Sequence, residues 1–501
     1  MDIFSFDFST LFSLQAVFAI ILGTVYGLFI GALPGLGATV GIALILPITY
    51  TLDPLPAILL LVAVYQAAEY GGSISSIVLG VPGTPAATAT LLDGLPLARK
   101  GSPGKALGYS LTASTIGGLI GGLVLMTLTI PLVNIAIKFG DPEFFLLGTL
   151  GLILVAGLSS KDIPKSVLSI LLGLLLGMIG IDGFTGSARF TFGSLTLLNG
   201  ISMVAILIGM FAVSEVLFML AELRKRYVTE KKNLKTHITW KEFKYVFLST
   251  IKGSFIGSFV GVLPGLGAGP ASWFAYTEAK RASKNPKEFG KGEPNGIAAP
   301  EAANNGAVGG ALVPLLTLGI PGSPATAVIL GAFLIQGIQL GPKVFESDPT
   351  LINGIFWGFL IVTIAMYVIG KYTTTLWAGM LTFPNHILAP IILFIALIGV
   401  YASSQNIFDV WIAVIAGCLA YFLKKLDFSL PSLILAFILG PIIETSYRRT
   451  VSMTNGDLTV FFTRPYSLAI LAIIVVMVIA MIFTNRRQKR QSKEGAEITP
   501  N

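Results

Sequence analysis

Long apolar runs alternate with short polar segments along almost the whole chain. A transmembrane helix needs about 20 mostly apolar residues, and the pattern therefore predicts an all-α polytopic membrane protein with about ten to twelve transmembrane helices. The apolar windows lie near residues 12–33, 55–80, 107–137, 143–159, 165–181, 200–220, 245–263, 351–370, 385–401, 406–423, 431–443 and 465–484. Only 12% of the residues are charged, against about 25% in an ordinary soluble domain. The lipid bilayer is thus the expected surrounding of the chain.

Two of the apolar segments are interrupted by nearly the same sequence. Residues 79–86 read LGVPGTPA, and residues 318–325 read LGIPGSPA. Two prolines and two glycines break an α-helix, whereas a hydroxyl residue followed by proline is a preferred start for a new one. The repeat predicts two broken or re-entrant helices, which in transporters mark the binding site. A pair of packing kinks is the alternative, but kinks explain neither the second proline nor the matched hydroxyl.

A second repeated motif shows that the chain contains two copies of a larger unit. Residues 31–38, GALPGLGA, return as residues 261–268, GVLPGLGA. Between the two motifs, Glu69 in the first copy is taken as the counterpart of Asn304 in the second, because AAEYG resembles AANNG. We predict a first inverted repeat over 12–220, a basic cytoplasmic linker over 221–244, a second inverted repeat over 245–445, a C-terminal transmembrane helix over 464–484 and a cytoplasmic tail over 485–501.

The loop charges indicate that the two copies are inverted relative to each other. Lys and Arg concentrate in cytoplasmic loops, and corresponding loops of the two copies differ in charge at three places. Acidic residues precede the first copy, whereas basic residues of the 221–244 linker precede the second. Asp53 lies between the motifs of the first copy, whereas five basic residues lie between those of the second; Arg99, Lys100 and Lys105 then follow the first break, whereas mixed charges follow the second. The N-terminus is predicted outside, and the C-terminus in the cytoplasm.

The breaks favour binding of an anion. Each restarted helix presents free N–H groups and about half a positive charge, and the two Pro-Gly-Leu-Gly turns raise the total to about +2. The motifs contain no Lys or Arg, so a polycarboxylate would be undercompensated and a bound cation is expected beside it. The candidate substrate-binding residues are Gly83, Thr84, Pro85, Gly322, Ser323, Pro324, Asn304, Asn305, Ser73, Gly35 and Gly265. Gly83 and Gly322 are expected to need backbone angles open only to glycine.

Neutral oxygen atoms near the breaks favour Na⁺ as the coupling ion. The candidate ligands are Ser75, Ser76, Thr88, Thr326, Gly37 and Gly267, although each hydroxyl could equally cap or pack a helix. Proton coupling through Glu69 is the alternative, and an uncoupled anion channel is another. The chain has no phosphate-binding loop of the Walker type and no HExxH motif, so we expect neither an enzyme with catalytic residues nor a cofactor. The basic residues cluster in loops beside apolar windows, which argues against nucleic acid as a partner.

Several separated motifs together resemble one transporter family. They are the two Pro-Gly-Leu-Gly-Ala turns, the segment 67–75, Gly80–Pro85 with Asp93 and Gly94 behind it, and Pro300–Gly306. This set resembles the large membrane subunit of the tripartite tricarboxylate transporters, TctA, over about residues 12–484. The resemblance implies a symporter in a bacterial inner membrane that imports a di- or tricarboxylate such as citrate. It also implies two partners, an extracytoplasmic substrate-binding protein and a small membrane subunit.

Overall fold

The computed structural model describes residues 6–158, 162–221, 234, 236–380, 385–479 and 481. Within these ranges, nine helices are long and apolar enough to cross a membrane, and four shorter apolar helices accompany them. The all-α polytopic fold is confirmed, and the total of ten to twelve crossings stays a prediction. Most of the 221–244 linker and all of the 485–501 tail lie outside the described residues.

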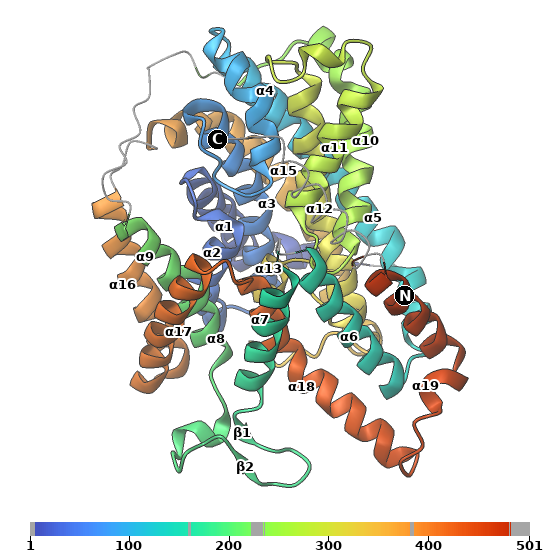
Figure 1. Cartoon of the computed structure of the whole chain (residues 1–501). Helices are drawn as coiled ribbons and strands as arrows, with labels where there is room; N and C mark the ends of the chain where they lie inside the picture. Colours follow the sequence, from blue (N-terminus) through green and yellow to red (C-terminus); the bar gives the residue numbers. More distant parts are fainter. Residues whose placement is uncertain are drawn as a thin grey trace, which may run out of the picture.

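The helices follow one another with few other elements between them (Figure 1). The first part of the chain contains α1 (Leu14–Ala32), α2 (Gly37–Ile45), α3 (Pro54–Leu79), α4 (Ala87–Arg99), α5 (Pro103–Ala136), α6 (Asp141–Leu158), α7 (Ile163–Gly177), β1 (Gly180–Ile181), β2 (Ala188–Arg189), α8 (Met203–Leu207), a π-helical turn (Ile208–Val213) and α9 (Ser214–Ala221). The second part contains α10 (Trp240–Val262), α11 (Ala268–Ala282), α12 (Asn295–Leu318), α13 (Pro324–Ile335), α14 (Val344–Ser347), α15 (Pro349–Met380), α16 (Asn385–Ser404), α17 (Ile407–Lys425), α18 (Leu430–Met453) and α19 (Val460–Thr463). Short 3₁₀ helices cover Phe8–Phe12, Leu46–Thr51, Thr196–Asn199 and Pro286–Glu288, and a further apolar helix covers Pro465–Ile479.

The same order of elements occurs twice. In the first copy α1, a turn, α2, α3, a break and α4 follow one another, and α10 to α13 repeat this series in the second copy. Both predicted breaks are confirmed, because α3 ends at Leu79 and α12 at Leu318, and new helices begin shortly afterwards. In the central body of the molecule, α12 packs against α3, α4, α5, α10 and α11 (Figure 1).

Glycines on the first helix of each copy allow the third helix to approach closely. Gly31 lies against the backbone of Ala68, and Gly261 lies against the backbone of Ala307. A methyl group at either position would collide with main-chain atoms, so the two helices touch through their backbones, as small-xxx-small helix pairs do. The whole set pairs Gly23, Gly27 and Gly31 with Leu60, Val64 and Ala68, and Gly253, Gly257 and Gly261 with Ala299, Ala303 and Ala307.

These contacts correct the alignment of the two copies between the motifs. Because Ala68 and Ala307 occupy equivalent places, Asn304 takes the place of Tyr65, with each lying fifteen residues before the glycine at its break. The expected pairing of Glu69 with Asn304 is therefore wrong by about one helical turn. Both segments contain two adjacent alanines, and aligning the segments on these alanines gave the wrong pairing.

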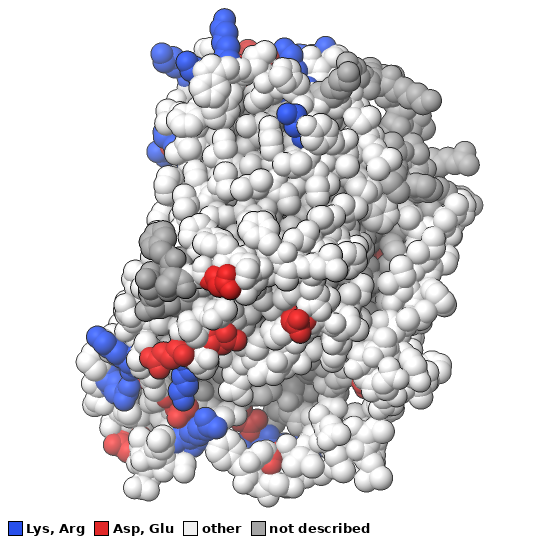
Figure 2. Space-filling view, turned by 180° about the vertical axis from the view of Figure 1, so that it is seen from behind, with Lys and Arg blue, Asp and Glu red and all other residues white. Residues whose placement is uncertain are grey.

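Hydrogen bonds between loops connect the two copies at two places. The Lys100 amino group, after α4, donates to the carbonyl of Lys291, which lies between α11 and α12, at 2.7 Å. At another place, the Gln336 side chain after α13 donates to the carbonyls of Thr49 and Leu52, which lie between α2 and α3. Each contact thus pairs the loop after one break with the loop between the motifs of the other copy. Figure 2 shows mostly basic charges at one end of the molecule, and acidic together with basic ones toward the other.

The segment between α7 and α8 is held to α18 by a cluster of charges. Arg189 on β2 donates to Glu444 at 2.8 Å and also bonds Asp182, while Arg448 donates to Asp182 at 3.0 Å. The backbone N–H of Phe184 and the Arg189 guanidinium hold the pKa of Asp182 well below its ordinary value. The carboxylate therefore stays charged at all ordinary pH values, and the β1–β2 turn keeps its place on α18.

The loop contacts and loop charges generate a labelling test of the inverted arrangement. After the exposed Cys418 is replaced by Ser, single cysteines at the exposed positions Asp53 and Lys284 should react with a membrane-impermeant thiol reagent from opposite sides. The reagent is added to intact cells and to inverted vesicles. A cysteine replacing Lys287, in the same loop as Lys284, is the matched control and should label with position 284. Labelling of positions 53 and 284 from one side would contradict the inverted arrangement.

Candidate functional site

A cavity of about 380 Å³ lies where the two copies meet. The starts of α2 and α11, together with the glycine turns before them, form one part of its lining. The residues that follow the two breaks, at the starts of α4 and α13, form another part. Its lining consists of Gly35, Leu36, Gly37, Ala38, Thr39, Tyr65, Glu69, Pro85, Ala86, Gly265, Leu266, Gly267, Ala268, Gly269, Pro270, Ser323, Pro324, Ala325 and Pro431. Four helix N-termini thus face one volume, as the two repeated motifs predict.

Glycines at positive φ direct these helix starts toward the cavity. Gly35 and Gly265 have φ values of +88° and +83°, and Gly37 and Gly267 have +65° and +61°. Other residues avoid this region, because their Cβ would approach the following carbonyl. The Gly265 N–H also donates to the Gly322 carbonyl at 3.0 Å, which attaches the turn of the second copy to its break.

Ser323 caps α13 as expected. Its hydroxyl accepts from the Thr326 N–H at 3.2 Å, and the Thr326 hydroxyl accepts from the Ser323 N–H at 2.8 Å. Thr84 is a weaker equivalent, because its hydroxyl accepts only from the Ala87 N–H, at 3.3 Å, and α4 begins at Ala87. The expectation of two equivalent caps is therefore wrong for the first copy.

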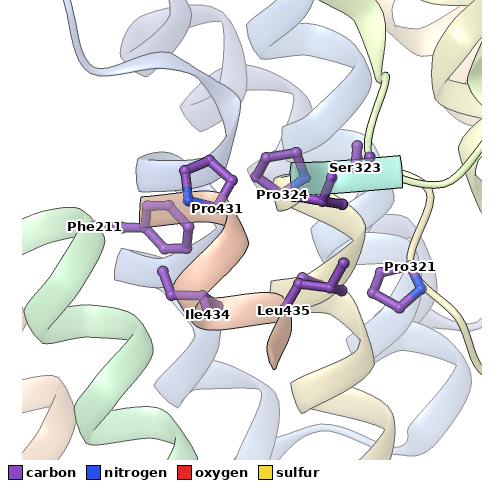
Figure 3. A pocket seen from close by; sticks show the side chains of 10 residues that line it. Phe211, Pro321, Ser323, Pro324, Pro431, Ile434 and Leu435 are labelled. Atoms are coloured by element: carbon purple, nitrogen blue, oxygen red, sulfur yellow. The ribbon is translucent and has the colours of Figure 1, made fainter. Parts of the chain in front are cut away.

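Ser323 also contacts the other copy. The Tyr65 hydroxyl on α3 lies 2.9 Å from the Ser323 hydroxyl. Figure 3 shows Ser323 and Pro324 at the start of α13, with Pro431 close to Pro324 at the start of α18. The second break is thus in contact with α3 of the first copy and with the start of α18.

Gly83 and Gly322 lie where the breaks pack against other helices. Neither has a positive φ, so the expectation of special backbone angles is wrong. A Cβ on Gly83 would collide with the Gly31 carbonyl, and one on Gly322 would lie 2.8 Å from the Gly261 carbonyl oxygen. These glycines allow the breaks to pack against α1 and α10, and neither lines the cavity. A branched residue there would disturb folding before it disturbed substrate binding.

The cavity has an unusual charge balance. Among the described residues that line it, Glu69 is the only carboxylic acid and none is Lys or Arg. Glu69 is 7% exposed, and its Oε2 has no hydrogen-bond partner. A buried carboxylate oxygen without a partner is costly, so a cation or a proton is expected beside it.

Further polar atoms without partners lie on α12 next to this carboxylate. The Asn304 amide donates to the Glu69 backbone carbonyl at 3.1 Å, while its Oδ1 is unpaired. Both side-chain polar atoms of Asn305 are also unpaired, and both residues are fully buried. Buried polar groups nearly always have partners in proteins. The arrangement therefore points to a ligand that binds among α3, α12 and the breaks.

The structure separates the predicted residues into two groups. Gly35, Pro85, Gly265, Ser323 and Pro324 line the cavity, as do the expected ion ligands Gly37 and Gly267. The others are not among the lining residues. Ser75 and Ser76 bond the Gly72 carbonyl, Thr88 bonds the Pro85 carbonyl and Trp273, Thr326 caps α13, and Ser73 bonds Ser110. Gly83 and Gly322 pack against α1 and α10, and Thr84, Asn304 and Asn305 are buried. The substrate and ion roles of both groups stay predictions.

Sequence reasoning missed two kinds of residue. Tyr65 could have been found by counting back from the breaks, because it stands where the second copy has Asn304. Pro431 carries no such signal, since it lies far along the chain and reaches the cavity only through the packing of α18 against α13. No group of three His, Cys, Asp or Glu side chains in the described ranges could hold a metal ion.

The unequal caps generate a prediction about stability. Ser323→Ala removes the cap and the partner of Tyr65, and should lower the free energy of unfolding by about 1 kcal/mol or more. Thr84→Ala should have a smaller effect, because its hydroxyl satisfies a single N–H at 3.3 Å. Thermal unfolding in detergent measures both, with Ser323→Thr and Thr84→Ser as controls that keep the hydroxyl and should keep the stability. Equal losses for the two alanine variants would contradict the asymmetry.

Comparisons with known proteins identify the family of the chain. The chain matches the model of the "Tripartite tricarboxylate transporter TctA family" over residues 17–435. It is 38% identical over 468 residues, 93% of both chains, to an Agrobacterium vitis protein described as "Uncharacterized 52.8 kDa protein in TAR-I ttuC' 3'region". It is 42% identical over 234 residues to a second protein of that organism, from the TAR-II ttuC' 3'region, and the match covers 47% of this chain and 97% of the relative. No solved structure matches. The chain belongs to the tripartite tricarboxylate transporter TctA family.

Proposed function

We propose that this chain is the large membrane subunit of a symporter that imports a di- or tricarboxylate across a bacterial inner membrane. An extracytoplasmic binding protein delivers the carboxylate, and a small membrane subunit completes the transporter. The family supports a membrane transporter subunit with such partners. The choice of a citrate-like substrate and of the coupling ion belongs to the proposal.

The observation that carries the proposal is the convergence of four helix N-termini on one cavity without Lys or Arg. Each N-terminus contributes about half a positive charge and free N–H groups, which bind carboxylate oxygens. Together they offset about two negative charges. This is the charge of a dicarboxylate, so the same cavity binds a tricarboxylate only with added positive charge.

Glu69 makes a coupling cation necessary. Its carboxylate lines the cavity and would repel an anionic substrate at close range. Na⁺ suits the site, because backbone carbonyls and the hydroxyls of Tyr65, Thr39 and Ser323 are hard oxygen ligands. Protonation of Glu69 is the second candidate, and its unpaired Oε2 favours it. Either ion binds together with the carboxylate and links uptake to an ion gradient.

The contacts between loops support inverted copies. In each contact, the loop that follows α4 or α13 lies beside the loop between the two motifs of the other copy. Two inverted copies bring their helix N-termini to the cavity from opposite faces of the membrane. A site built in this way is reached from one side and then the other when one copy moves against its surroundings.

The proposed site predicts that a larger residue at Gly269 blocks the substrate. A Cβ at Gly269 meets only the Pro85 side chain, at 3.8 Å, so Gly269→Leu fills the cavity without colliding with the backbone. We expect affinity for the carboxylate that co-purifies with the binding protein to fall at least about tenfold, or 1.4 kcal/mol. Calorimetry on the purified chain measures it. The control is Thr277→Leu, on the exposed side of α11. Unchanged binding by properly folded Gly269→Leu would contradict the site.

The coupling ion is tested separately by uptake into proteoliposomes that contain the chain and its small subunit, with the binding protein added. We expect accumulation with an inward Na⁺ gradient at fixed pH and little without Na⁺. Glu69→Gln should abolish the dependence on Na⁺, because it removes the one carboxylate that lines the cavity. Full uptake with a proton gradient alone, lost in Glu69→Gln, would select the proton instead. Uptake that never exceeds equilibrium with any gradient would indicate a channel.

A further inference from the structure

A second buried carboxyl group, Glu301, lies on α12 away from the cavity. It is fully buried, and no Lys, Arg or His among the described residues bonds to it. Three hydroxyl groups lie within 3.0 Å of its carboxyl oxygens. Thr90 on α4 lies 2.5 Å from Oε1, and Ser110 and Ser114 on α5 lie 3.0 and 2.9 Å from Oε2. An ionised carboxylate at such a place has no cation to compensate its charge.

The hydrogen bonds continue beyond these hydroxyls and fix their direction. The Ser73 hydroxyl lies 2.8 Å from the Tyr70 carbonyl, and it must donate to it because a carbonyl oxygen only accepts. Ser73 also lies 2.5 Å from the Ser110 hydroxyl. Since Ser73 has a single proton, Ser110 must donate to Ser73. The proton of Ser110 is thereby used.

The contact between Ser110 and Glu301 then needs a proton from another source. The network contains five hydrogen bonds, whereas the hydroxyls of Ser73, Thr90, Ser110 and Ser114 supply four protons. A protonated carboxylic acid that donates from Oε2 to Ser110 would supply the fifth proton. A protonated Glu301 satisfies the whole chain from α12 through α5 to α3.

We propose that Glu301 and these four hydroxyls form a proton-binding site, that it is occupied in this conformation, and that its proton sets the pH dependence of transport. The pH dependence rests on the proposed transport function, whereas the occupied site does not. The proton leaves from the carboxyl group and returns to it, so no other reactant is involved.

The site connects helices that belong to different breaks. Thr90 belongs to α4, the helix that begins at the first break, whereas Glu301 belongs to α12, the helix that ends at the second. Loss of the proton leaves a charge that must be solvated or neutralised. Any conformation that separates α4 from α12 or admits water therefore binds this proton more weakly, and proton release and that conformation favour each other.

The other ionisable groups around α12 leave Glu301 without a charged partner. On α3, Glu69 interacts with Glu301 as a like charge, and the Tyr70 hydroxyl bonds Thr374. On α4, α5, α10 and α11, several groups have partners other than Glu301: Asp93 accepts from the N–H groups of Gly290, Gly292 and Glu293 and from Tyr276, Lys105 pairs with Glu242, and Tyr245 donates to Glu293. Two carboxyl groups in one dry region disfavour simultaneous ionisation. This like charge is a second reason for a neutral Glu301.

Infrared spectroscopy of the purified full chain tests the protonation directly. The wild-type protein at neutral pH should show the C=O stretching band of a protonated carboxyl group that shifts in heavy water. Glu301→Gln, which has the same shape and can still donate to Ser110, should lose this component. Glu69→Gln is the matched control and should keep it. A carboxyl region unchanged by Glu301→Gln would show that Glu301 is ionised and would overturn the proposal.

Two hydroxyl variants keep the test decisive if Glu301→Gln does not fold. Ser110→Ala removes the acceptor of the acid proton and should shift the band, whereas Ser114→Ala should leave that bond in place and shift it less. Equal spectra for wild type and Ser110→Ala would overturn the proposal. No transport is needed for these measurements, so they stand even if the carboxylate function fails.

Transport measurements test the claim that this proton sets the pH dependence of uptake. Uptake by wild-type proteoliposomes at a constant Na⁺ gradient should decline as the pH rises and Glu301 loses its proton. Glu301→Gln is neutral at every pH and should show uptake without that decline. The same pH profile in both proteins would overturn the claim that this proton sets the pH dependence.

Discussion

The structure depends on one constraint, which is that main-chain polar groups at membrane depth need partners inside the protein. Breaking α3 and α12 frees such groups, and the surrounding helices must supply the contacts. They can do so because glycines on α1 and α10 allow backbone to touch backbone. The breaks then pack against Gly31 and Gly261, and the helix starts that follow them are directed into one cavity. Close packing is therefore the condition for a site made of N–H groups.

The two buried carboxyl groups show how the same interior provides different chemistry. Glu69 lines the cavity and has an unpaired oxygen, so it is available to an ion that arrives with the substrate. Glu301 is enclosed by hydroxyls from α4 and α5 and is out of the lining. One group is placed to meet a ligand, and the other holds helices of both copies together.

The sequence predicted the features that local chemistry decides. The two breaks follow from the prolines, glycines and hydroxyls in each motif, and the all-α membrane fold follows from the apolar windows. The sequence did not predict which side chains face the cavity, because this depends on how each helix is rotated. Ser73 and Ser323 both lie near a break, but only Ser323 lines the cavity. Tyr65 and Ser323 are far apart in the chain, and only the packing of the two copies brings their hydroxyls within 2.9 Å. The roles of Gly83 and Gly322 also depend on a neighbouring backbone that no local motif shows.

The central claim is that backbone N–H groups at the helix starts bind the carboxylate, and it can be measured without any substitution. Solid-state NMR on the chain in lipid, with ¹⁵N-labelled glycine and a ¹³C-carboxyl-labelled substrate, reports the distance between the substrate and glycine amides. Gly35, Gly37, Gly265, Gly267 and Gly269 line the cavity, so the account predicts dipolar contacts between the substrate carboxyl carbons and a subset of glycine nitrogens. Bound substrate with no such contact to any glycine amide would contradict it.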